Sequence, residues 1–539
     1  MSSTMRILTG GRVFTADPEQ PWAEAVVIDG ERIAFVGGRQ AAREHAGEGA
    51  SLTDTGGGVV VPGFVDAHAH VVMTGAGMLK AQLRDAPDLP EIQRRLVEWS
   101  RANPTEPRVL GISWQFSSVP GGAPTVAMID AVIDDRPVYL EANDLHSAWV
   151  NSRALEELGI TGDTPDPIGG QIVRDAAGAA TGHLLETALV ELVWPVVGRV
   201  GDAERDRHLA AAIRAYTECG VTTAVDMAMT EDSLAAMIRA EQRGALDVRI
   251  VGHWIVRRCA DPADEVAQVA HAATLAATYG SDRLRIAGIK IIVDGTIDGC
   301  TAAMIEPYSN GSNADPIWDY DSLVRVVTAA DAAGLQVAMH AIGDRAVRSA
   351  IDALEQAIAT NGSSGRRHRI EHLEYVDEAD VARLAQLGIT ASMQPVHIDP
   401  AILPNWAAML GDHRVDRGFA WPEFLAAGAT LAFGTDTPTA PHLPLHNMYI
   451  AATRKSPGDS TIEPHRPDFA LPLAESVVHA TRDAAWASFL DDRVGTIRAG
   501  NIADLVVLDC DPFALGPDSL LTARAVETIV GGGTVHLAR

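Results

Sequence analysis

The chain reads VPGFVDAHAH over residues 61–70. We predict a β-strand in the last eight residues of this stretch, with His68 and His70 at the end of the strand. Because alternate side chains of a strand share a face, both imidazoles project into one cavity. Two imidazoles on one face suit a borderline metal ion such as Zn²⁺. Two core or surface histidines would give the same motif, so the motif alone leaves both interpretations open.

Seven further short apolar or β-branched runs follow, and helical patterns alternate with them. These runs span residues 220–227, 247–255, 287–295, 335–344, 368–375, 389–395 and 430–436. Alternation of this kind predicts a parallel sheet. Eight parallel strands are the number that closes a (β/α)₈ barrel, whose active site lies at the C-terminal ends of the strands. We therefore predict an α/β fold built on a TIM barrel.

The two ends of the chain differ from its middle. Both are rich in short strands joined by Gly and Asp turns, which predicts one small β-sandwich domain assembled from residues 1–62 and 490–539. Two unrelated β-appendages are the alternative. The catalytic barrel would then span residues 63–489. Residues from about 75 to 205 separate the first two barrel strands, and a connection of this length predicts a structured insertion and a candidate lid.

The charge balance restricts the partners. Among 539 residues, 43 are Lys or Arg and 71 are Asp or Glu, so the net charge is −28. An acidic surface repels phosphate backbones and anionic lipids, so we expect a small-molecule substrate and neither nucleic acid nor membrane as a partner. A homodimer is expected only because dimers are the commonest assembly of soluble enzymes.

The compartment is expected to be the cytoplasm. The N-terminal residues show no basic segment followed by an apolar run, and no stretch approaches 18 uninterrupted apolar residues. The four cysteines, Cys219, Cys259, Cys300 and Cys510, lie far apart and form no CxxC pair. This spacing argues against a disulfide framework and against a thiolate zinc site.

Further ligand-type residues stand at the same ends of other predicted strands. His340 ends the fifth strand, His372 the sixth and Asp436 the eighth, while Lys290 lies within the fourth. Scattered core histidines would have no reason to gather at one end of a barrel, so the set favours a single site. Lys290 by itself could instead pair with a nearby carboxylate.

The joint pattern resembles the amidohydrolase superfamily, and in detail its amidohydrolase family 3 branch, which includes N-substituted formamide deformylases. The similarity covers nearly the entire chain, with further matching motifs at residues 144–155, 290–304, 339–347, 369–376 and 499–509. It implies two divalent metal ions, most naturally Zn²⁺, in a distorted TIM barrel. His68, His70 and Asp436 would hold one ion. His340 and His372 would hold the second, and a carboxylated Lys290 would bridge the two ions.

The resemblance also implies a reaction. Two such ions lower the pKa of a shared water and polarise a carbonyl, and Asp436 would act as general base and then protonate the departing amine. We therefore expect a hydrolase that cleaves a C–N bond other than a peptide bond through a metal-activated hydroxide. An N-formyl or N-acyl amide is the expected substrate class.

Three alternatives stay open at this point. The same site could serve a deaminase, or a hydrolase of cyclic amides, lactones or phosphoesters, because fold alone does not select the reaction. The presence of Lys290 favours amide hydrolysis over deamination. A one-metal site is the fallback if the lysine is not carboxylated, with the ligands His68, His70, His340 and Asp436. A non-catalytic scaffold would be expected to have lost ligands, and this chain has lost none.

Substrate contacts have weaker signals. His146 and Glu186 match family positions, Trp114 could line a pocket, and Arg345 could bind a carboxylate in bidentate geometry. Each has a structural alternative. These are a helix cap or loop hydrogen bond for His146, a solvated helix position for Glu186, the core for Trp114, and an ion pair with Asp344 or a barrel carboxylate for Arg345.

Four more residues lie beside the predicted strand ends. Asp294 and Asp298 could orient metal ligands or cap a turn. His397 and His446 are interpreted as structural.

Overall fold

The structure is a computed structural model that describes residues 5–143, 145–167, 170–363 and 365–538. It divides into two compact units. The first comprises Met1–Val71, Ile213–Thr437 and Pro441–Arg539, and the second comprises Val72–Ala212 with Pro438–Ala440.

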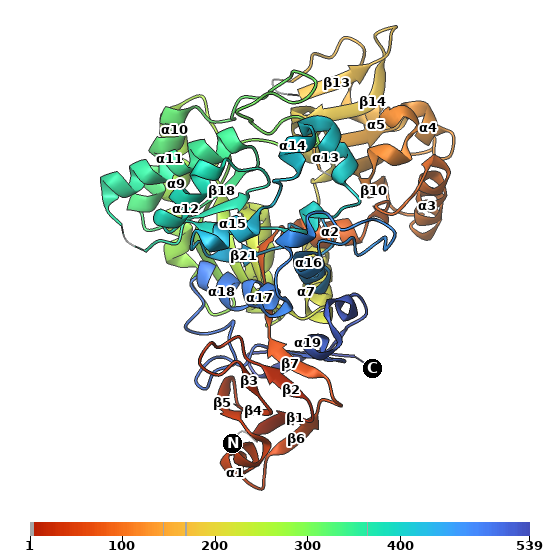
Figure 1. Ribbon diagram of the computed structural model, residues 1–539. Coiled ribbons are helices and arrows are strands. Elements are labelled where there is room, and N and C mark those ends of the chain that lie inside the picture. Colours follow the sequence, from red (N-terminus) through yellow and green to blue (C-terminus); the bar gives the residue numbers. More distant parts are fainter. Residues whose placement is uncertain (1–4, 144, 168–169, 364, 539) are drawn as a thin grey trace. The chain divides into compact units, whose positions relative to one another are not determined.

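A parallel eight-stranded sheet forms the centre of the first unit (Figure 1). Around the sheet the order is β21, β20, β19, β18, β17, β16, β15, β8. The bounds in chain order are β8 Phe64–Ala69, β15 Val221–Met229, β16 Arg249–Ile255, β17 Leu284–Ile292, β18 Gln336–Ala341, β19 Arg369–His372, β20 Thr390–Met393 and β21 Leu431–Phe433. A parallel bridge between Ala69 and Thr437 joins the two outermost strands. The eight predicted strands and the α/β barrel are therefore confirmed.

Helices flank the barrel strands, and Asp side chains cap the starts of some of them. They include α8 Glu231–Gln242, α9 Pro262–Thr278, α10 Tyr320–Ala332, α11 Asp344–Asn361, α12 Glu378–Gln386, α15 Trp421–Ala426, α16 Pro444–Thr453 and α18 Arg482–Ala487. Asp261, Asp319 and Asp377 each accept a backbone N–H in the first turn of α9, α10 and α12. Such caps satisfy N–H groups that the helix itself leaves unpaired.

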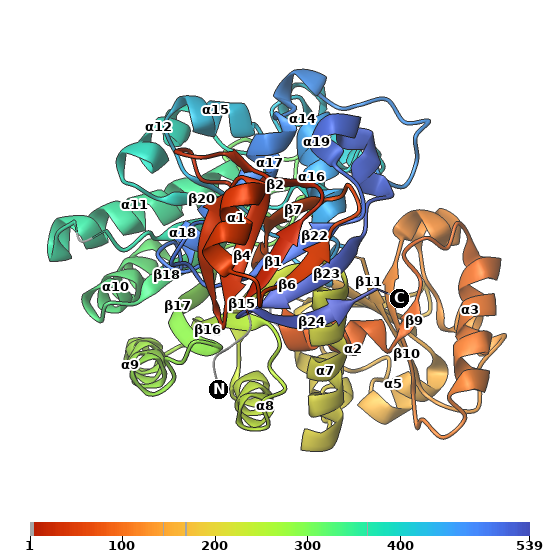
Figure 2. The ribbon, with the colours of Figure 1, turned by 90° about the horizontal axis from the view of Figure 1, so that it is seen from below.

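Strands from both ends of the chain lie side by side (Figure 2). One sheet has the order β5, β4, β1, β6, and the other has the order β24, β23, β22, β7, β2, β3. Their bounds are β1 Arg6–Thr9, β2 Arg12–Phe14, β3 Trp22–Ala23, β4 Ala25–Asp29, β5 Arg32–Gly37, β6 Ser51–Asp54, β7 Val59–Pro62, β22 Leu505–Leu508, β23 Ala525–Val530 and β24 Gly533–Leu537.

A common apolar core connects these two terminal sheets. It contains Leu8 and Val26 from the first sheet and Val60, Leu505 and Ile529 from the second. The interleaved ends belong to the same compact unit as the barrel. The division into a separate sandwich domain over 1–62 and 490–539 stays a prediction.

The second unit contains the predicted insertion and has its own sheet and cores. The sheet order is β13, β14, β12, β11, β10, β9. The bounds are β9 Ala81–Gln82, β10 Val109–Trp114, β11 Val138–Ala142, β12 Ser147–Val150, β13 Gly170–Arg174 and β14 Ala180–Glu186, with helices α3 Leu89–Ala102 and α5 Ser152–Leu158. Leu96, Leu140 and Trp149 contribute to one core, and Ile172 and Leu184 to another. The insertion is thus a folded body, and its role as a lid stays a prediction.

Within the described part of the chain, every helix is too short or too polar to cross a lipid bilayer.

A buried ion pair ties the barrel to the terminal strands. Arg249 begins β16, and its Nε and Nη2 lie 2.6 and 3.0 Å from the two carboxylate oxygens of Asp504. Removing one member of a buried pair leaves the other charge uncompensated. We expect Asp504→Ala to lower the free energy of unfolding by about 3–5 kcal/mol, measured by denaturant titration.

Asp468→Ala is the matched control, because Arg466 binds Asp468 in the same bidentate geometry at an exposed position. The control should leave the unfolding midpoint unchanged, since exposed ion pairs contribute little. Equal losses in the two variants would contradict this account.

Candidate metal centre

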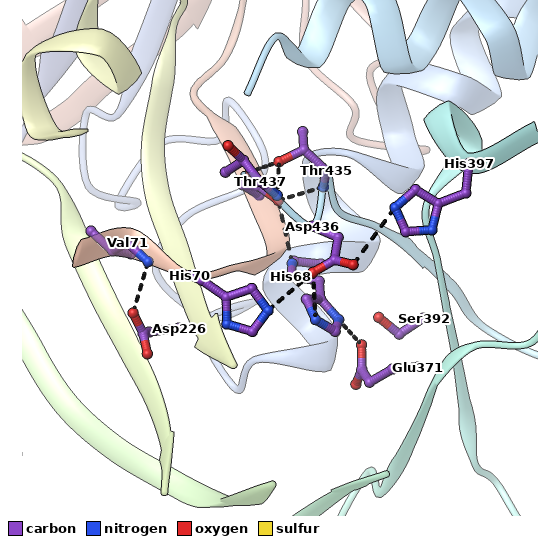
Figure 3. A network of polar contacts seen from close by, with 12 residues as sticks. His68, His70, Val71, Asp226, Glu371, Ser392, His397, Thr435, Asp436 and Thr437 are labelled. Carbon is purple, nitrogen blue, oxygen red and sulfur yellow. Dashed lines mark hydrogen bonds and ion pairs between the residues drawn. The ribbon is translucent and has the colours of Figure 1, made fainter. Parts of the chain in front are cut away.

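Three predicted ligands meet where the first and last barrel strands adjoin (Figure 3). Oδ1 of Asp436 lies 3.2 Å from Nε2 of His68 and 3.1 Å from Nε2 of His70. His68 and Asp436 are buried, and His70 is partly buried. One ligand atom from each residue lies within 4.8 Å of the others, which is the grouping expected of a metal site.

Two features of the β21 end bring Asp436 to this position. Its backbone N–H donates to the His68 carbonyl at 2.7 Å, and its φ of 55° places it in the left-handed region. At Gly434 a Cβ atom would lie 2.3 Å from the backbone nitrogen of His68, so only glycine permits the two strands to approach this closely. A non-glycine residue with positive φ costs of order 1–3 kcal/mol and persists where its surroundings hold it, commonly at functional sites.

A carboxylate behind His68 fixes which imidazole nitrogen faces the site. Oε2 of Glu371 lies 2.7 Å from Nδ1 of His68. Although burial opposes ionisation, Arg369 and His68 hold the pKa of Glu371 well below its usual range. An ionised carboxylate can only accept, so Nδ1 donates and Nε2 presents a lone pair. That lone pair faces another acceptor, Oδ1 of Asp436, and a cation between the two would remove their repulsion.

Arg369 holds Glu371 in place. Its Nε lies 2.5 Å from Oε1 of Glu371, while Nη2 donates to the carbonyl of Ala67 at 2.7 Å and to the hydroxyl of Ser392 at 2.6 Å. Both charged side chains are fully buried. Sequence reasoning missed this pair. The signal was the spacing of Arg369 and Glu371, two residues apart in a predicted strand and hence on one face.

His372 lies between the other histidines. Its ring centre is 4.9 Å from that of His68 and 4.5 Å from that of His340. Burial lowers the pKa of His372 well below its usual value, which keeps the imidazole neutral, the form that binds metals. Its Nδ1 is buried and has no hydrogen-bond partner among the described residues. A buried imidazole nitrogen without a hydrogen-bond partner is suited to binding a cation.

His340 and Lys290 come from neighbouring strands. Nε2 of His340 lies 3.1 Å from the carbonyl of Gly295 and 3.5 Å from Oδ1 of Asp294. Asp294 also accepts backbone N–H groups from Ala303, Ile342 and Gly343, so it both orders the turns and contacts His340. Lys290 lies in β17 and is buried, and burial lowers its pKa to about 8.

His397, which the sequence analysis interprets as structural, also faces the site. Its Nε2 lies 3.6 Å from Oδ2 of Asp436, and its Nδ1 lies 3.4 Å from Oε1 of Glu374. Its ring stacks on His372 at 5.8 Å with an interplanar angle of 9°. His372, Glu374 and His397 form a second group whose ligand atoms lie within 4.8 Å of one another.

Three of the four predicted substrate contacts belong to the second unit. In the second unit, Nδ1 of His146 lies 2.7 Å from Oε2 of Glu186, and both side chains are partly exposed. Trp114 is fully buried in a core of that unit and donates its indole N–H to Leu140, so we correct its assignment from pocket to core.

Arg345 is corrected as well. It forms an exposed ion pair with Asp315 at 3.0 Å. Asp344, its predicted alternative partner, instead accepts the backbone N–H groups of Ile305 and Arg345.

The chain is similar to known proteins over most of its length. Residues 52–536 match the amidohydrolase family. The protein LONG AFTER FAR-RED 3 of Arabidopsis thaliana is 31% identical to this chain, over 98% of the chain and 91% of the relative. N-substituted formamide deformylase of Arthrobacter pascens is 26% identical, over 98% of the chain and 97% of the relative.

A solved structure is similar over the same extent. The crystal structure of an uncharacterized metal-dependent hydrolase from Pyrococcus horikoshii has a TM-score of 0.77 and 25% sequence identity, and the match covers 95% of this chain and 99% of that chain.

The contribution of Glu371 to metal binding can be tested by substitution. We expect Glu371→Gln to weaken divalent metal binding about 10–100-fold, because glutamine can still accept from Nδ1 but no longer places a negative charge behind the ligand. Competition with a chromophoric chelator measures the change. Asp331→Asn is the control, since Asp331 is a buried carboxylate that binds a different histidine, His368, at 3.0 Å. Unchanged affinity in Glu371→Gln would refute the role of Glu371.

Proposed function

This chain belongs to the amidohydrolase family of metal-dependent hydrolases, and we propose that it cleaves a non-peptide C–N bond in an N-formyl or N-acyl amide. The resemblance drawn from the sequence motifs is thereby confirmed at the level of the family. The name of the Arthrobacter pascens relative supports the substrate class. The observation that carries the proposal is the lone pair of His68 Nε2 facing a carboxylate oxygen, with His70 beside them.

The donor types fit zinc-like ions. Imidazole nitrogens and carboxylate oxygens are ligands that Zn²⁺ accepts, and those of His68, His70 and Asp436 come together at the end of the barrel. In our proposal these three residues would hold one ion, and His340, His372 and a carboxylated Lys290 would supply the ligands of a second. When bound, such ions lower the pKa of a water toward neutrality and polarise the substrate carbonyl.

Asp436 performs the proton transfer in this proposal. Although burial opposes ionisation, the hydrogen bond from His70 lowers the pKa of Asp436 below its usual range, so the side chain is an ionised carboxylate that can accept a proton. It takes that proton from the attacking water and delivers it to the amine nitrogen as the C–N bond breaks. Delivery is required because an unprotonated amine is a poor leaving group. The fixed direction of the carboxylate, set by the hydrogen bond from its own backbone N–H to His68, keeps it at the reacting centre.

Lys290 is suited to carboxylation. The reaction with CO₂ requires the neutral amine, and a pKa of about 8 leaves a substantial neutral fraction near physiological pH. An ammonium at the same position would repel a divalent ion, whereas the carboxylated form supplies an anionic oxygen.

A combined assay tests the function. Purified chain, analysed for bound metal, is offered N-formyl amines, N-acyl amines, amino-substituted rings, lactones and phosphoesters. Release of a free amine supports the proposal. Release of ammonia from an amino-substituted ring would identify a deaminase instead, and lactone opening without amide cleavage would identify a different hydrolase.

The role of Asp436 has its own test. We expect Asp436→Asn to reduce kcat about 10²–10⁴-fold, the range of general acid–base catalysis, while metal remains bound. The amide oxygen can still coordinate but cannot accept the proton. The measurements are steady-state kinetics and elemental analysis of the same sample. Near-normal kcat in this variant would remove the assignment.

The state of Lys290 predicts a pH and CO₂ dependence. Because only the neutral amine reacts, carboxylation should increase as the pH rises toward and past about 8 and decrease below it. Incubation with ¹³C-bicarbonate followed by ¹³C NMR detects the carbamate directly. Lys290→Met supplies the control and should lack the signal. A wild-type spectrum identical to that of the control at high pH would exclude carboxylation.

A further inference from the structure

Two isoleucines end neighbouring barrel strands beside the proposed metal ligands, and the mechanism does not use them. Ile292 is the last residue of β17 and 39% of its surface is exposed, whereas the eight residues before it are buried or partly buried. Ile255 is the last residue of β16 and is partly buried. Both residues therefore lie at the C-terminal end of the barrel, where the active sites of this fold are built.

The strand register shows which face of the sheet these side chains occupy. Ala338 of β18 packs in one core with Val225 and Ala432, which come from β15 and β21. Neither of those strands adjoins β18, so Ala338 faces the barrel interior. Lys290 pairs with Ala338, and Ile255 pairs with Lys290. Because paired residues of adjacent strands share a face, Lys290 and Ile255 face the interior as well.

Ile292 stands beside His340 on the same inner face. The two residues are register partners, and each lies two residues beyond the inward-facing pair of Lys290 and Ala338. Side chains two residues apart in a strand share a face. The exposed side chain of Ile292 is therefore at the inner rim of the barrel, next to a proposed ligand of the second ion.

The rim differs in chemistry from one side to the other. On the side of β8 and β21, Oδ1 of Asp436 faces the imidazole of His68. On the side of β16 and β17, the strand ends present the hydrocarbon of Ile255 and Ile292. Ile317, which is 53% exposed, is tied to the end of β17 because its N–H donates to the carbonyl of Val293 at 2.8 Å. Exposed apolar groups that gather at one place are typical of ligand-binding surfaces.

We propose that Ile255 and Ile292 form an apolar substrate subsite beside the metal centre, and that the preferred amides carry an aliphatic chain next to the C–N bond that is cleaved. An aliphatic group placed against these side chains removes apolar surface from water. A charged or hydroxylated group there would lose hydrogen bonds to water and gain none from isoleucine.

This inference rests on the proposed function and deepens it. The subsite sets the polarity of the group next to the cleaved bond, and it leaves the rest of the substrate to the surrounding loops.

The affinity of metal-binding hydroxamates tests the subsite without any turnover. Hydroxamic acids from acetyl to hexanoyl carry the chain on the acyl side, and N-formyl-N-alkylhydroxylamines from methyl to hexyl carry it on the amine side. With the zinc-loaded wild-type chain, calorimetry should give a Kd that falls about two- to fourfold for each added methylene in at least one series. A Kd independent of chain length in both series would overturn the proposal.

Conservative substitutions test which residues form the subsite. Ile292→Thr and Ile255→Thr keep a β-branched side chain in the strand but replace hydrocarbon by a hydroxyl. Each should raise the Kd of the longest ligand about 2–10-fold and leave the Kd of the shortest ligand and the zinc content unchanged. Val266→Thr is the matched control, because Val266 is 36% exposed on the outer helix α9, and it should bind both ligands like the wild type. An unchanged length dependence in both folded isoleucine variants would overturn the assignment.

The subsite and the reaction can fail separately. If N-formyl or N-acyl amides release amine but neither kcat/KM nor Kd depends on chain length, the subsite alone is refuted. If longer ligands bind more tightly, Ile292→Thr removes that gain and no amide is hydrolysed, the proposed function alone is refuted.

Discussion

Closure of the barrel between its first and last strands is the constraint on which the site depends. The bridge from Ala69 to Thr437 and the hydrogen bond from Asp436 to the His68 carbonyl join two segments from distant parts of the chain. Asp66 strengthens the junction, because its carboxylate accepts from the N–H and the hydroxyl of Thr435 at 2.8 and 2.6 Å. Without this closure the carboxylate of Asp436 would not meet the histidines of the first strand.

Electrostatics then determines the state of each buried group. Arg369 keeps the carboxylate of Glu371 ionised in spite of burial, and the hydrogen bond from His70 favours the ionised form of Asp436. Burial keeps His68 and His372 neutral, because it lowers the pKa of both. The lone pairs of these groups are therefore directed at one region. A metal ion stabilises such an arrangement, because the protein atoms alone leave some of the lone pairs without a hydrogen-bond donor.

Substrate selection is a separate question from metal binding. One fold can support several reactions, so membership of the family does not by itself name the substrate. The second compact unit has its own sheet and cores, and it contains the paired side chains of His146 and Glu186. Loops and insertions vary more readily than barrel strands, and they are where the substrate preference of such enzymes is set.

The sequence by itself determined the eight strands and the predicted ligands at their ends. Each strand follows from local alternation and composition, and the face shared by His68 and His70 follows from the two-residue period of a strand. Only the tertiary structure decided that Arg369 and Glu371 lie behind His68 and that His397 faces Asp436. It also decided that Trp114 lies in a core and that Arg345 forms an exposed ion pair. The physical reason is that these contacts join residues from different strands and loops. Periodicity is a property of neighbouring residues in the sequence. The contact partner of a side chain depends instead on which distant segments of the chain the fold brings together.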